Sequence, residues 1–337
     1  MEMFSDVYST ALVQWAANKP EVVVLSGDLT GSTEISAFKN IYPDRFFSMG
    51  MAEQNMLSWA GGMAREGYTP FLHTFAVFLY RRPLDQLSMS IAYPNLRVRL
   101  VGFLPGITTP GGVTHQAIDD LAILRAIPNM TIFEMGDATD IETFLDVAQS
   151  VDGPVYVRMM RGQIPRLFPA SEPLRINHAR VLSEGTDVSL ISTGICTEEA
   201  IRVTKALRHH GVSIQHLHVS TIKPFRDPLV EDALHKAKYG VITFENHSML
   251  GGVGTAVAET MATMGVRGPL VRIGIPDRYS HGATRGYLIK ELGLDGMSLV
   301  RQIEKILSTS LGIQESDLAA ISLDVKQTLN PDQLEVL

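Results

Sequence analysis

Short apolar runs alternate with amphipathic stretches along the chain, and this pattern predicts strands that alternate with helices. The run VVVLS at 22–26 is short and uniformly apolar, which is typical of a strand buried on both faces. In the first half, strands are predicted at 22–26, 69–73, 97–102, 130–134 and 154–159. The helices between them are expected at 5–18 with Ser5 as N-cap, 52–65, 78–92, 118–125 and 138–149. We therefore place a first α/β domain at residues 1–161.

A second α/β series follows a segment without periodicity. Residues 162–178 carry three prolines and are predicted to form a linker. Beyond them we expect strands at 187–192, 213–219, 240–244 and 270–274, and helices at 197–210, 228–238 and 255–264. The predicted fold is thus α/β, with two parallel-sheet domains at 1–161 and 179–311. The tail at 312–337 has a helical pattern, and we assign it no function.

Composition and charge narrow the class of partner. The chain has 337 residues with 29 Lys and Arg against 36 Asp and Glu, a formal net charge of −7. Such a charge disfavours nucleic acid and anionic membranes and favours a small-molecule ligand. The single cysteine, Cys196, excludes an internal disulfide and a multi-cysteine metal site, and it fits a reducing compartment. Because the sequence shows neither a signal peptide nor a spanning apolar run, we expect a cytoplasmic protein.

Candidate chemistry gathers in the loops after the predicted strands, where open α/β sheets bind ligands. These loops contain Ser26–Ser32, Met49–Asn55 with Glu53, Thr74–Phe78, and Pro110–Gln116 with His115. Each has an ordinary structural alternative, namely a turn, a carboxylate at a helix start, a core aromatic pair and a loop histidine. Arg161, after the last strand of the first domain, either binds an anion or is solvated. No single loop decides the function.

Other conspicuous features favour structural roles. Gly251–Gly254 lacks the full dinucleotide-binding pattern, so we interpret it as close packing before a helix. Cys196 lies at a strand-to-helix turn without an obvious base, which favours a buried, inert thiol.

Taken in order, five segments of the first domain resemble the pyrimidine-binding domain of the transketolase family of thiamine-diphosphate enzymes. They are GDLTGS, GMAEQNM, TFAVF, GGVTHQAIDDLAILRAIPNM and PVYVRMMRG. The later segments DVSLISTG, TFENHSMLGGVGTAVAE and RIGIPDRYSHG resemble the C-terminal domain of that family, so the likeness covers about residues 1–310.

The resemblance also implies a partner. Transketolases bind the cofactor diphosphate and a divalent metal through a GDG…N-type segment of an N-terminal domain, and the sequence contains no such segment. The chain therefore resembles the second subunit of a split transketolase. We expect a separate subunit to bring the diphosphate site and Mg²⁺, and we assign no metal ligand to this chain. Family likeness further implies self-association into a dimer or heterotetramer with active sites at subunit interfaces.

The cofactor roles follow the family's motifs. Glu53 matches the glutamate that stabilises the imino tautomer of the aminopyrimidine through a ring nitrogen. Phe75 and Phe78 match the aromatics that enclose the pyrimidine ring. Asp28 and Leu29 match positions beside the cofactor.

The substrate roles come from the same likeness. His115 matches a histidine that contacts the substrate near the reacting carbonyl and hydrogen-bonds a developing alkoxide. Arg161 matches the arginine that binds the terminal phosphate of the sugar, and Ser32 matches a serine beside it.

Departures from the family pattern fall on substrate recognition. An aspartate that usually contacts a substrate hydroxyl is replaced by Gly111. A phosphate-site arginine and histidine fall at Ser5 and at Phe103 or Leu104, and the expected tyrosine falls at Arg81, next to Tyr80. We infer that the substrate is not an ordinary sugar phosphate bound in the ordinary way.

The preferred interpretation is transfer of a two-carbon ketol unit from a ketose to an aldose, on thiamine diphosphate, in a heteromeric complex. Two enzymes of the same architecture remain as alternatives: a β-type subunit of a 2-oxoacid dehydrogenase and a deoxyxylulose-phosphate-synthase-like enzyme. A non-catalytic structural subunit is the third alternative. The THQ loop and Arg161 favour a sugar-binding site.

Overall fold

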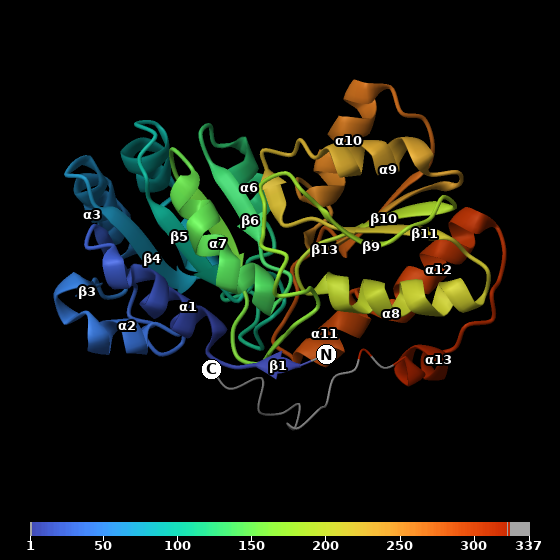
Figure 1. Ribbon diagram of the computed structural model, residues 1–337, viewed down its shortest axis with the longest axis horizontal. Helices are drawn as coiled ribbons and strands as arrows, with labels where there is room; N and C mark the ends of the chain where they lie inside the picture. The colour runs from blue at the N-terminus through green and yellow to red at the C-terminus, as the bar shows by residue number, and fades with distance from the viewer. Residues whose placement is uncertain (1, 322, 324–337) are drawn as a thin grey trace.

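The computed structural model describes residues 2–321 and 323, which form two α/β units side by side (Figure 1). The larger sheet has the strand order β12 (Thr221–Lys223), β6 (Thr131–Glu134), β7 (Val155–Met159), β5 (Arg99–Phe103), β4 (Thr69–Phe75), β2 (Val22–Ser26), β3 (Phe46–Ser48). The smaller has the order β14 (Leu270–Ile275), β13 (Gly240–Ser248), β10 (Val188–Ser192), β11 (Ile214–His218), β9 (Arg180–Ser183). Both sheets are parallel except for one antiparallel strand at an edge, β12 or β9. The predicted fold class is confirmed.

The helices of the first unit are α1 (Val7–Trp15), η1 (Ala16–Asn18), α2 (Ser36–Ile41), η2 (Pro43–Arg45), α3 (Glu53–Arg65), α4 (Ala76–Tyr80), α5 (Leu84–Gln86), the π-helix η3 (Leu87–Ala92), α6 (Asp120–Ala126) and α7 (Ala138–Ser150). Those of the second unit are α8 (Cys196–His209), α9 (Pro228–Lys236), α10 (Val253–Met264), α11 (Arg285–Glu291), α12 (Gly296–Leu307) and α13 (Glu315–Ala320). In Figure 1, α9 and α10 lie on one side of the smaller sheet, and α8 and α12 lie on the other.

Two helix predictions were wrong in detail. The first helix is capped at Asp6 in a left-handed conformation, not at Ser5, and no side-chain hydrogen bond closes the cap. The continuous helix expected at 78–92 is divided into α4, α5 and η3. The division falls around Pro83, whose missing N–H and ring do not fit a helix interior. Of the predicted tail, α13 lies within the described residues, whereas position 322 and positions 324–337 lie outside them.

Two strand pairings that connect distant segments were not predicted. Within the predicted linker, β8 (Ile164–Pro165) pairs antiparallel with β1 (Met3–Phe4) at the start of the chain. From the second unit, β12 crosses to the first and pairs antiparallel with β6. Lys223, in β12, also donates a 2.9 Å hydrogen bond from Nζ to the carbonyl oxygen of Arg125. The larger sheet is therefore completed by a segment of the second unit.

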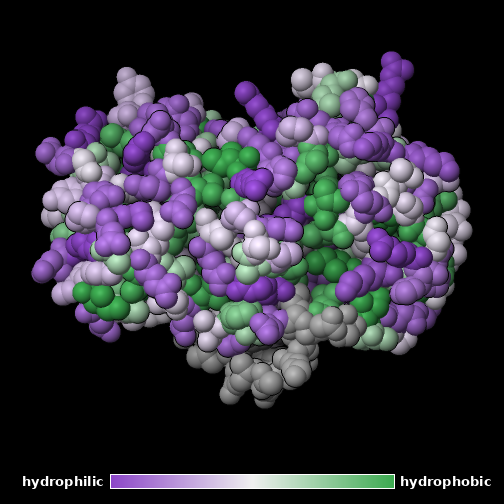
Figure 2. All heavy atoms as spheres, viewed as in Figure 1, coloured by the Kyte–Doolittle hydropathy of each residue, from purple (hydrophilic) through white to green (hydrophobic). Residues whose placement is uncertain are grey.

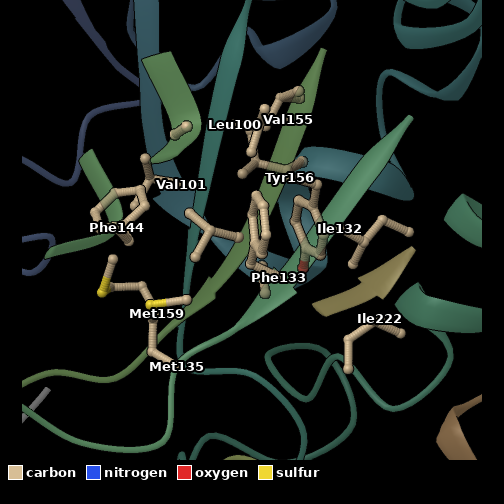
Figure 3. Packing of buried hydrophobic residues seen from close by; sticks show 14 of the residues in the cluster. Leu100, Val101, Ile132, Phe133, Met135, Phe144, Val155, Tyr156, Met159 and Ile222 are labelled. Atoms are coloured by element: carbon tan, nitrogen blue, oxygen red, sulfur yellow. The ribbon is translucent and has the colours of Figure 1, made fainter. Parts of the chain in front are cut away.

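The core of the first unit lies between the larger sheet and its helices. Figure 3 shows Leu100, Val101, Phe133, Phe144 and Tyr156 packed together, and all five are buried. On the face drawn in Figure 2, polar side chains cover most of the surface and the apolar patches are small. In the part of the chain that the structure describes, every helix is too short or too polar to cross a membrane.

Candidate active site

The parallel strands β2, β4 and β5 end at the same edge of the larger sheet. Ser26 is in register with His73, and Phe75 with Phe103. The loops that leave this edge contain the residues singled out by the sequence. The topology therefore brings the segments that follow β2, β4 and β5, which begin at positions 27, 76 and 104, to the same edge of the sheet.

Glu53 is the first residue of α3, and its side chain is only 2% exposed. Its Oε1 accepts a 2.6 Å hydrogen bond from Nη1 of Arg82, a residue that is 43% exposed. The Arg82 guanidinium also packs over the ring of Phe78, 3.8 Å from the ring centroid. A buried carboxylate and an aromatic face thus share one planar cationic partner, which sequence reasoning did not find.

Phe75, Phe78 and His115 form a cluster of rings beside Glu53. The two phenylalanine rings are stacked, with centroids 5.9 Å apart and an interplanar angle of 27°. The His115 ring meets both edge-on, at centroid distances of 6.0 Å from Phe75 and 5.5 Å from Phe78. The structure therefore brings these three predicted site residues together.

The groups around Glu53 are of the types that suit the aminopyrimidine of thiamine diphosphate. Oγ1 of the fully buried Thr74 has no hydrogen-bond partner within the protein, so this hydroxyl is available to a ligand. A Cβ on Gly27 would lie 3.1 Å from Cβ of Thr74 and 3.7 Å from Oε1 of Glu53, so a larger residue at position 27 would crowd both side chains. A buried carboxylate, an unpaired hydroxyl and an aromatic face are the groups that an amino-substituted heterocycle requires. The exposed Asp28 and the half-buried Leu29 directly follow Gly27 in the same loop.

The His115 loop is ordered by short contacts. Thr114 Oγ1 lies 2.9 Å from Nδ1 of His115, and the backbone N–H of His115 donates to the carbonyl oxygen of Gly112. A Cβ on Gly111 would lie 3.0 Å from Cγ of His115. The ring thus rests against the position where the family usually has an aspartate.

Ser32 and Arg161 are in contact, though not as two side chains around an anion. Nη1 of Arg161 donates a 2.9 Å hydrogen bond to the backbone carbonyl oxygen of Ser32. Glu34 lies close by and accepts a 2.7 Å hydrogen bond from the N–H of Gly162. Burial raises the pKa of Glu34, and the negative charge of Asp6 adds to that effect. The arginine expected to bind a phosphate therefore has an acidic neighbour that sequence reasoning did not predict.

Tyr80 and Arg81, at the position where the family has a tyrosine, share one acceptor, the carboxylate of Asp119. Tyr80 is buried, and its hydroxyl donates to Oδ1 of Asp119. Arg81 pairs with the same oxygen at 2.8 Å and reaches the carbonyl oxygens of Val113 and Gln116. Arg81 thus holds both ends of the THQ segment.

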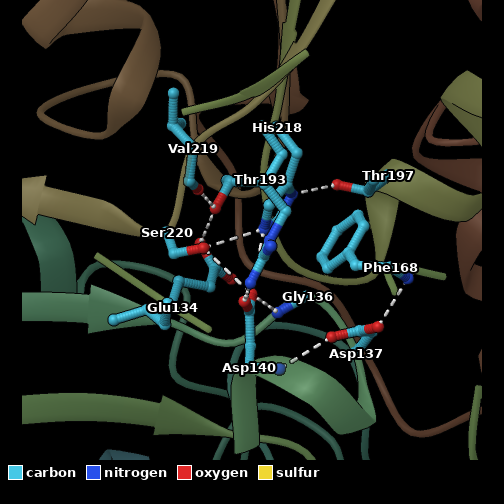
Figure 4. Close-up of polar contacts among 12 residues, drawn as sticks. Glu134, Gly136, Asp137, Asp140, Phe168, Thr193, Thr197, His218, Val219 and Ser220 are labelled. Atoms are coloured by element: carbon cyan, nitrogen blue, oxygen red, sulfur yellow. Dashed lines mark hydrogen bonds and ion pairs between the residues drawn. The ribbon is translucent and has the colours of Figure 1, made fainter. Parts of the chain in front are cut away.

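A second polar cluster lies at the junction of the two units (Figure 4). His218 bridges them, since its Nδ1 lies 2.7 Å from Oγ1 of Thr197 and its Nε2 lies 3.2 Å from Oδ2 of Asp140. Burial acts to raise the pKa of Asp140, but His218 and Arg180 outweigh it and lower that pKa. Every group in this chain of contacts is paired inside the protein, which indicates a structural junction.

Cys196 is buried at the start of α8, and burial raises the pKa of its thiol. The predicted inert thiol is thus supported by its surroundings. Among the described residues, no group of three His, Cys, Asp or Glu side chains is placed to hold a metal ion.

Sequence reasoning assigned no role to four residues in or near the site: Thr74, which lies in a loop that it singled out, and Arg82, Glu34 and Asn246. The contact of Arg82 with Glu53 could not be predicted, because the two residues are 29 positions apart and Arg82 was assigned to a continuous helix. Asn246 belongs to the run Glu245–Asn246–His247, three polar residues that are fully buried at the end of β13. Polar residues directly after an apolar strand were the available signal.

Comparison with known proteins identifies the class. Residues 3–166 match the family "Transketolase, pyrimidine binding domain", and residues 177–298 match "Transketolase, C-terminal domain". The chain belongs to the transketolase family of thiamine-diphosphate enzymes. Within that family it corresponds to the pyrimidine-binding domain followed by the C-terminal domain.

Individual relatives agree with this assignment. The chain is 36% identical to a "Putative transketolase C-terminal section" of Methanocaldococcus jannaschii, over 88% of this chain and 93% of the relative. It is 34% identical to the "6-deoxy-6-sulfo-D-fructose transketolase subunit SqwH" of Clostridium sp. strain MSTE9, over 89% and 93%. A solved structure described as "Split gene transketolase, inactive beta4 tetramer" superposes with a TM-score of 0.80 at 34% identity, over 90% and 97% of the two chains. Deoxyxylulose-phosphate synthases also match, but the chain covers only about half of their length.

Proposed function

We propose that this chain is the pyrimidine-binding subunit of a heteromeric transketolase, which transfers a two-carbon ketol unit from a ketose donor to an aldose acceptor. The observation that carries the proposal is the ring cluster of Phe75, Phe78 and His115, which Arg82 links to the buried Glu53. A partner subunit with the diphosphate and Mg²⁺ site would complete the active site.

Thiamine diphosphate, when bound, supplies the nucleophilic carbon that attacks the ketose carbonyl. Glu53 holds the proton shared with a ring nitrogen of the aminopyrimidine, and its burial keeps water away from that proton. The rings of Phe75 and Phe78 orient the heterocycle by stacking. Thr74 supplies the further hydrogen bond that its unpaired hydroxyl has available.

His115 acts on the substrate side of the site. When the hydroxyl of Thr114 donates to Nδ1, the imidazole proton lies on Nε2. That nitrogen then donates a hydrogen bond to the alkoxide that develops from a carbonyl oxygen. The position of His115 beside both phenylalanine rings supports this role.

The distal end of the substrate is recognised in an unusual way in this proposal. Arg161 would bind a negatively charged end group, but Glu34 beside it cancels part of its charge. Gly111 removes a hydroxyl-binding carboxylate, as the comparison with the family pattern indicates. We therefore infer a substrate whose end group is a monoanion or is neutral, rather than a phosphate dianion. A sulfonated ketose is one such substrate class, and the similar subunit from Clostridium is named for one.

The first test is calorimetric titration of thiamine diphosphate with Mg²⁺ into this chain alone and into its mixture with a candidate diphosphate-binding subunit. We expect tight binding only in the mixture. Tight binding to the isolated chain would overturn the proposed division of labour.

The second test is turnover of the mixture with phosphorylated, sulfonated and unsubstituted ketoses. Glu53→Gln should lower turnover at least about a hundredfold, because it removes the proton-sharing carboxylate. Glu66→Gln is the matched control, since Glu66 is exposed at the other end of α3. Equal activity of both variants would favour a structural subunit, and condensation of pyruvate with an aldose phosphate would favour a deoxyxylulose-phosphate-synthase-like enzyme.

A further inference from the structure

The loop that carries His115 belongs to the first unit by sequence, but it is fastened by the second. Its two ends are closed by a bridge between Pro105 and Ala117, and the N–H of Gly106 donates to the carbonyl oxygen of Ala117 at 2.9 Å. Immediately outside this closure, the N–H of Ser248 donates to the carbonyl oxygen of Ile118 at 2.8 Å. The base of the loop therefore lies directly against the end of β13.

Asn246 makes the central contact between β13 and the loop. Its Oδ1 accepts a 3.1 Å hydrogen bond from the N–H of Ile107, and its Nδ2 donates a 3.1 Å hydrogen bond to the carbonyl oxygen of Pro105. The two bonds bracket Gly106, which has φ 60° and approaches the amide so closely that a Cβ would lie 2.2 Å from Oδ1. Asn246 is fully buried, so the amide is held without competition from water.

The backbone of Asn246 is itself anchored. Its carbonyl oxygen accepts a 2.9 Å hydrogen bond from Nη2 of Arg158, and the same nitrogen donates to the carbonyl oxygen of Ala117. One buried arginine therefore joins the far end of the loop to the strand that carries Asn246.

The residues on either side of His115 contact another segment of the second unit. Nε2 of Gln116 donates a 3.2 Å hydrogen bond to the carbonyl oxygen of His281. A Cβ on Gly112 would lie 3.1 Å from the backbone nitrogen of Gly282. The loop thus has two contacts with the second unit, Asn246 near its start and residues 281–282 against Gly112 and Gln116, on either side of His115.

We propose that Asn246 is a positioning residue for His115, so that the second unit sets the geometry with which the first unit recognises the substrate carbonyl. The role of His115 in this statement rests on the proposed function, whereas the control of the loop by Asn246 does not. The residues proposed to contact the cofactor, Glu53 and Thr74, belong to α3 and β4 and not to this loop. Substitution of Asn246 is therefore expected to separate substrate recognition from cofactor binding.

The test compares Asn246→Ala with Asn129→Ala in the full chain. Asn129 also donates a side-chain hydrogen bond to a backbone carbonyl, that of Ala92, but it lies outside the site. Hydrogen exchange followed by mass spectrometry should show at least tenfold faster exchange across residues 105–118 in Asn246→Ala, with strand β4 unchanged. In the reconstituted complex, kcat/KM for the substrate should fall at least tenfold while the dissociation constant of thiamine diphosphate changes less than twofold.

Asn246→Asp provides a second variant in case Asn246→Ala does not fold. It retains an acceptor for the N–H of Ile107 and loses the donor to Pro105, so an intermediate effect is expected. Unchanged exchange in the loop of either folded variant would overturn the proposal. Faster exchange in the loop of a complex that has no transketolase activity would instead leave the positioning in place and refute the proposed function.

Discussion

Replacement of Arg158 by methionine should be among the most destabilising single changes in the larger unit. Arg158 is fully buried, and it pairs with Asp120 at 3.0 Å and with Glu134 at 2.5 Å. Removal of one partner from a buried ion pair costs about 3–5 kcal/mol, because the other charge remains without compensation. Tyr156 still donates to Asp120 at 2.6 Å, which places the expected loss near the middle of that range. With a urea dependence of about 3 kcal/mol per molar, the unfolding midpoint should fall by about 1–1.5 M.

Arg99 offers a matched control for this change. It is also buried, but its guanidinium donates to the neutral carbonyl oxygens of Gly153 and Val151. Burial lowers the pKa of Arg99 to about 10, whereas the adjacent carboxylates raise that of Arg158 above its ordinary value despite burial. Arg99→Met removes no carboxylate partner and should cost only about 1–3 kcal/mol.

The assay is urea unfolding followed by tryptophan fluorescence. Both tryptophans, Trp15 and Trp59, belong to the first unit, so the signal reports the unit that contains Arg158. Glu134→Gln in the Arg158→Met background should recover part of the loss, because it removes one of the stranded carboxylates. A loss no larger than that of Arg99→Met, or no recovery in the double variant, would refute the reasoning.

Three further changes test separate parts of the structure. Arg82→Ala frees Glu53 from its cationic partner, so calorimetry of the mixed subunits should show at least threefold tighter thiamine diphosphate binding; weaker binding would mean that the arginine assists the cofactor. Gly111→Asp pushes against the His115 ring and should lower kcat/KM at least about tenfold, measured by steady-state kinetics, whereas unchanged kinetics would contradict the contact. Burial raises the pKa of Glu245 from its ordinary value to about 7. The protonated carboxyl therefore contributes about 3 kcal/mol to stability below about pH 4.5, and this contribution is lost as pH rises through 7. In denaturant titrations at pH 5 and 8, the unfolding free energy of Glu245→Gln should therefore change less with pH than that of the wild type. The same change with pH in both proteins would exclude the burial effect.

The sequence was sufficient for most strands and for the ring cluster, because these depend on local pattern and on motif order. Strand β2 lies where the run VVVLS predicts it, at Val22–Ser26. The partner of Glu53 was not predictable in this way. Arg82 reaches it only because α4 ends near Pro83 and turns the chain back over Phe78. Such a contact depends on the path of the chain in three dimensions rather than on the spacing of residues.

The substrate end of the site shows the same limit. Residue types indicated a loss of anion contacts at Ser5 and at Phe103 or Leu104, but they gave no sign that Glu34 would approach Arg161. Glu34 is held by the N–H of Gly162, which lies 128 positions away along the chain. A charge introduced by tertiary contact cannot be read from a motif.

The crossing of β12 into the larger sheet has a consequence for any attempt to dissect this protein. A fragment that ends near position 161 would lack Thr221–Lys223 and would leave the outer edge of β6 unpaired. Exposed strand edges recruit other chains, so such a fragment is expected to aggregate rather than to fold as an isolated domain. The reverse fragment would carry a strand without a sheet to join. Although each half has its own sheet, the first half needs a strand from the second to complete its sheet. Truncated variants should therefore keep both halves on the same polypeptide.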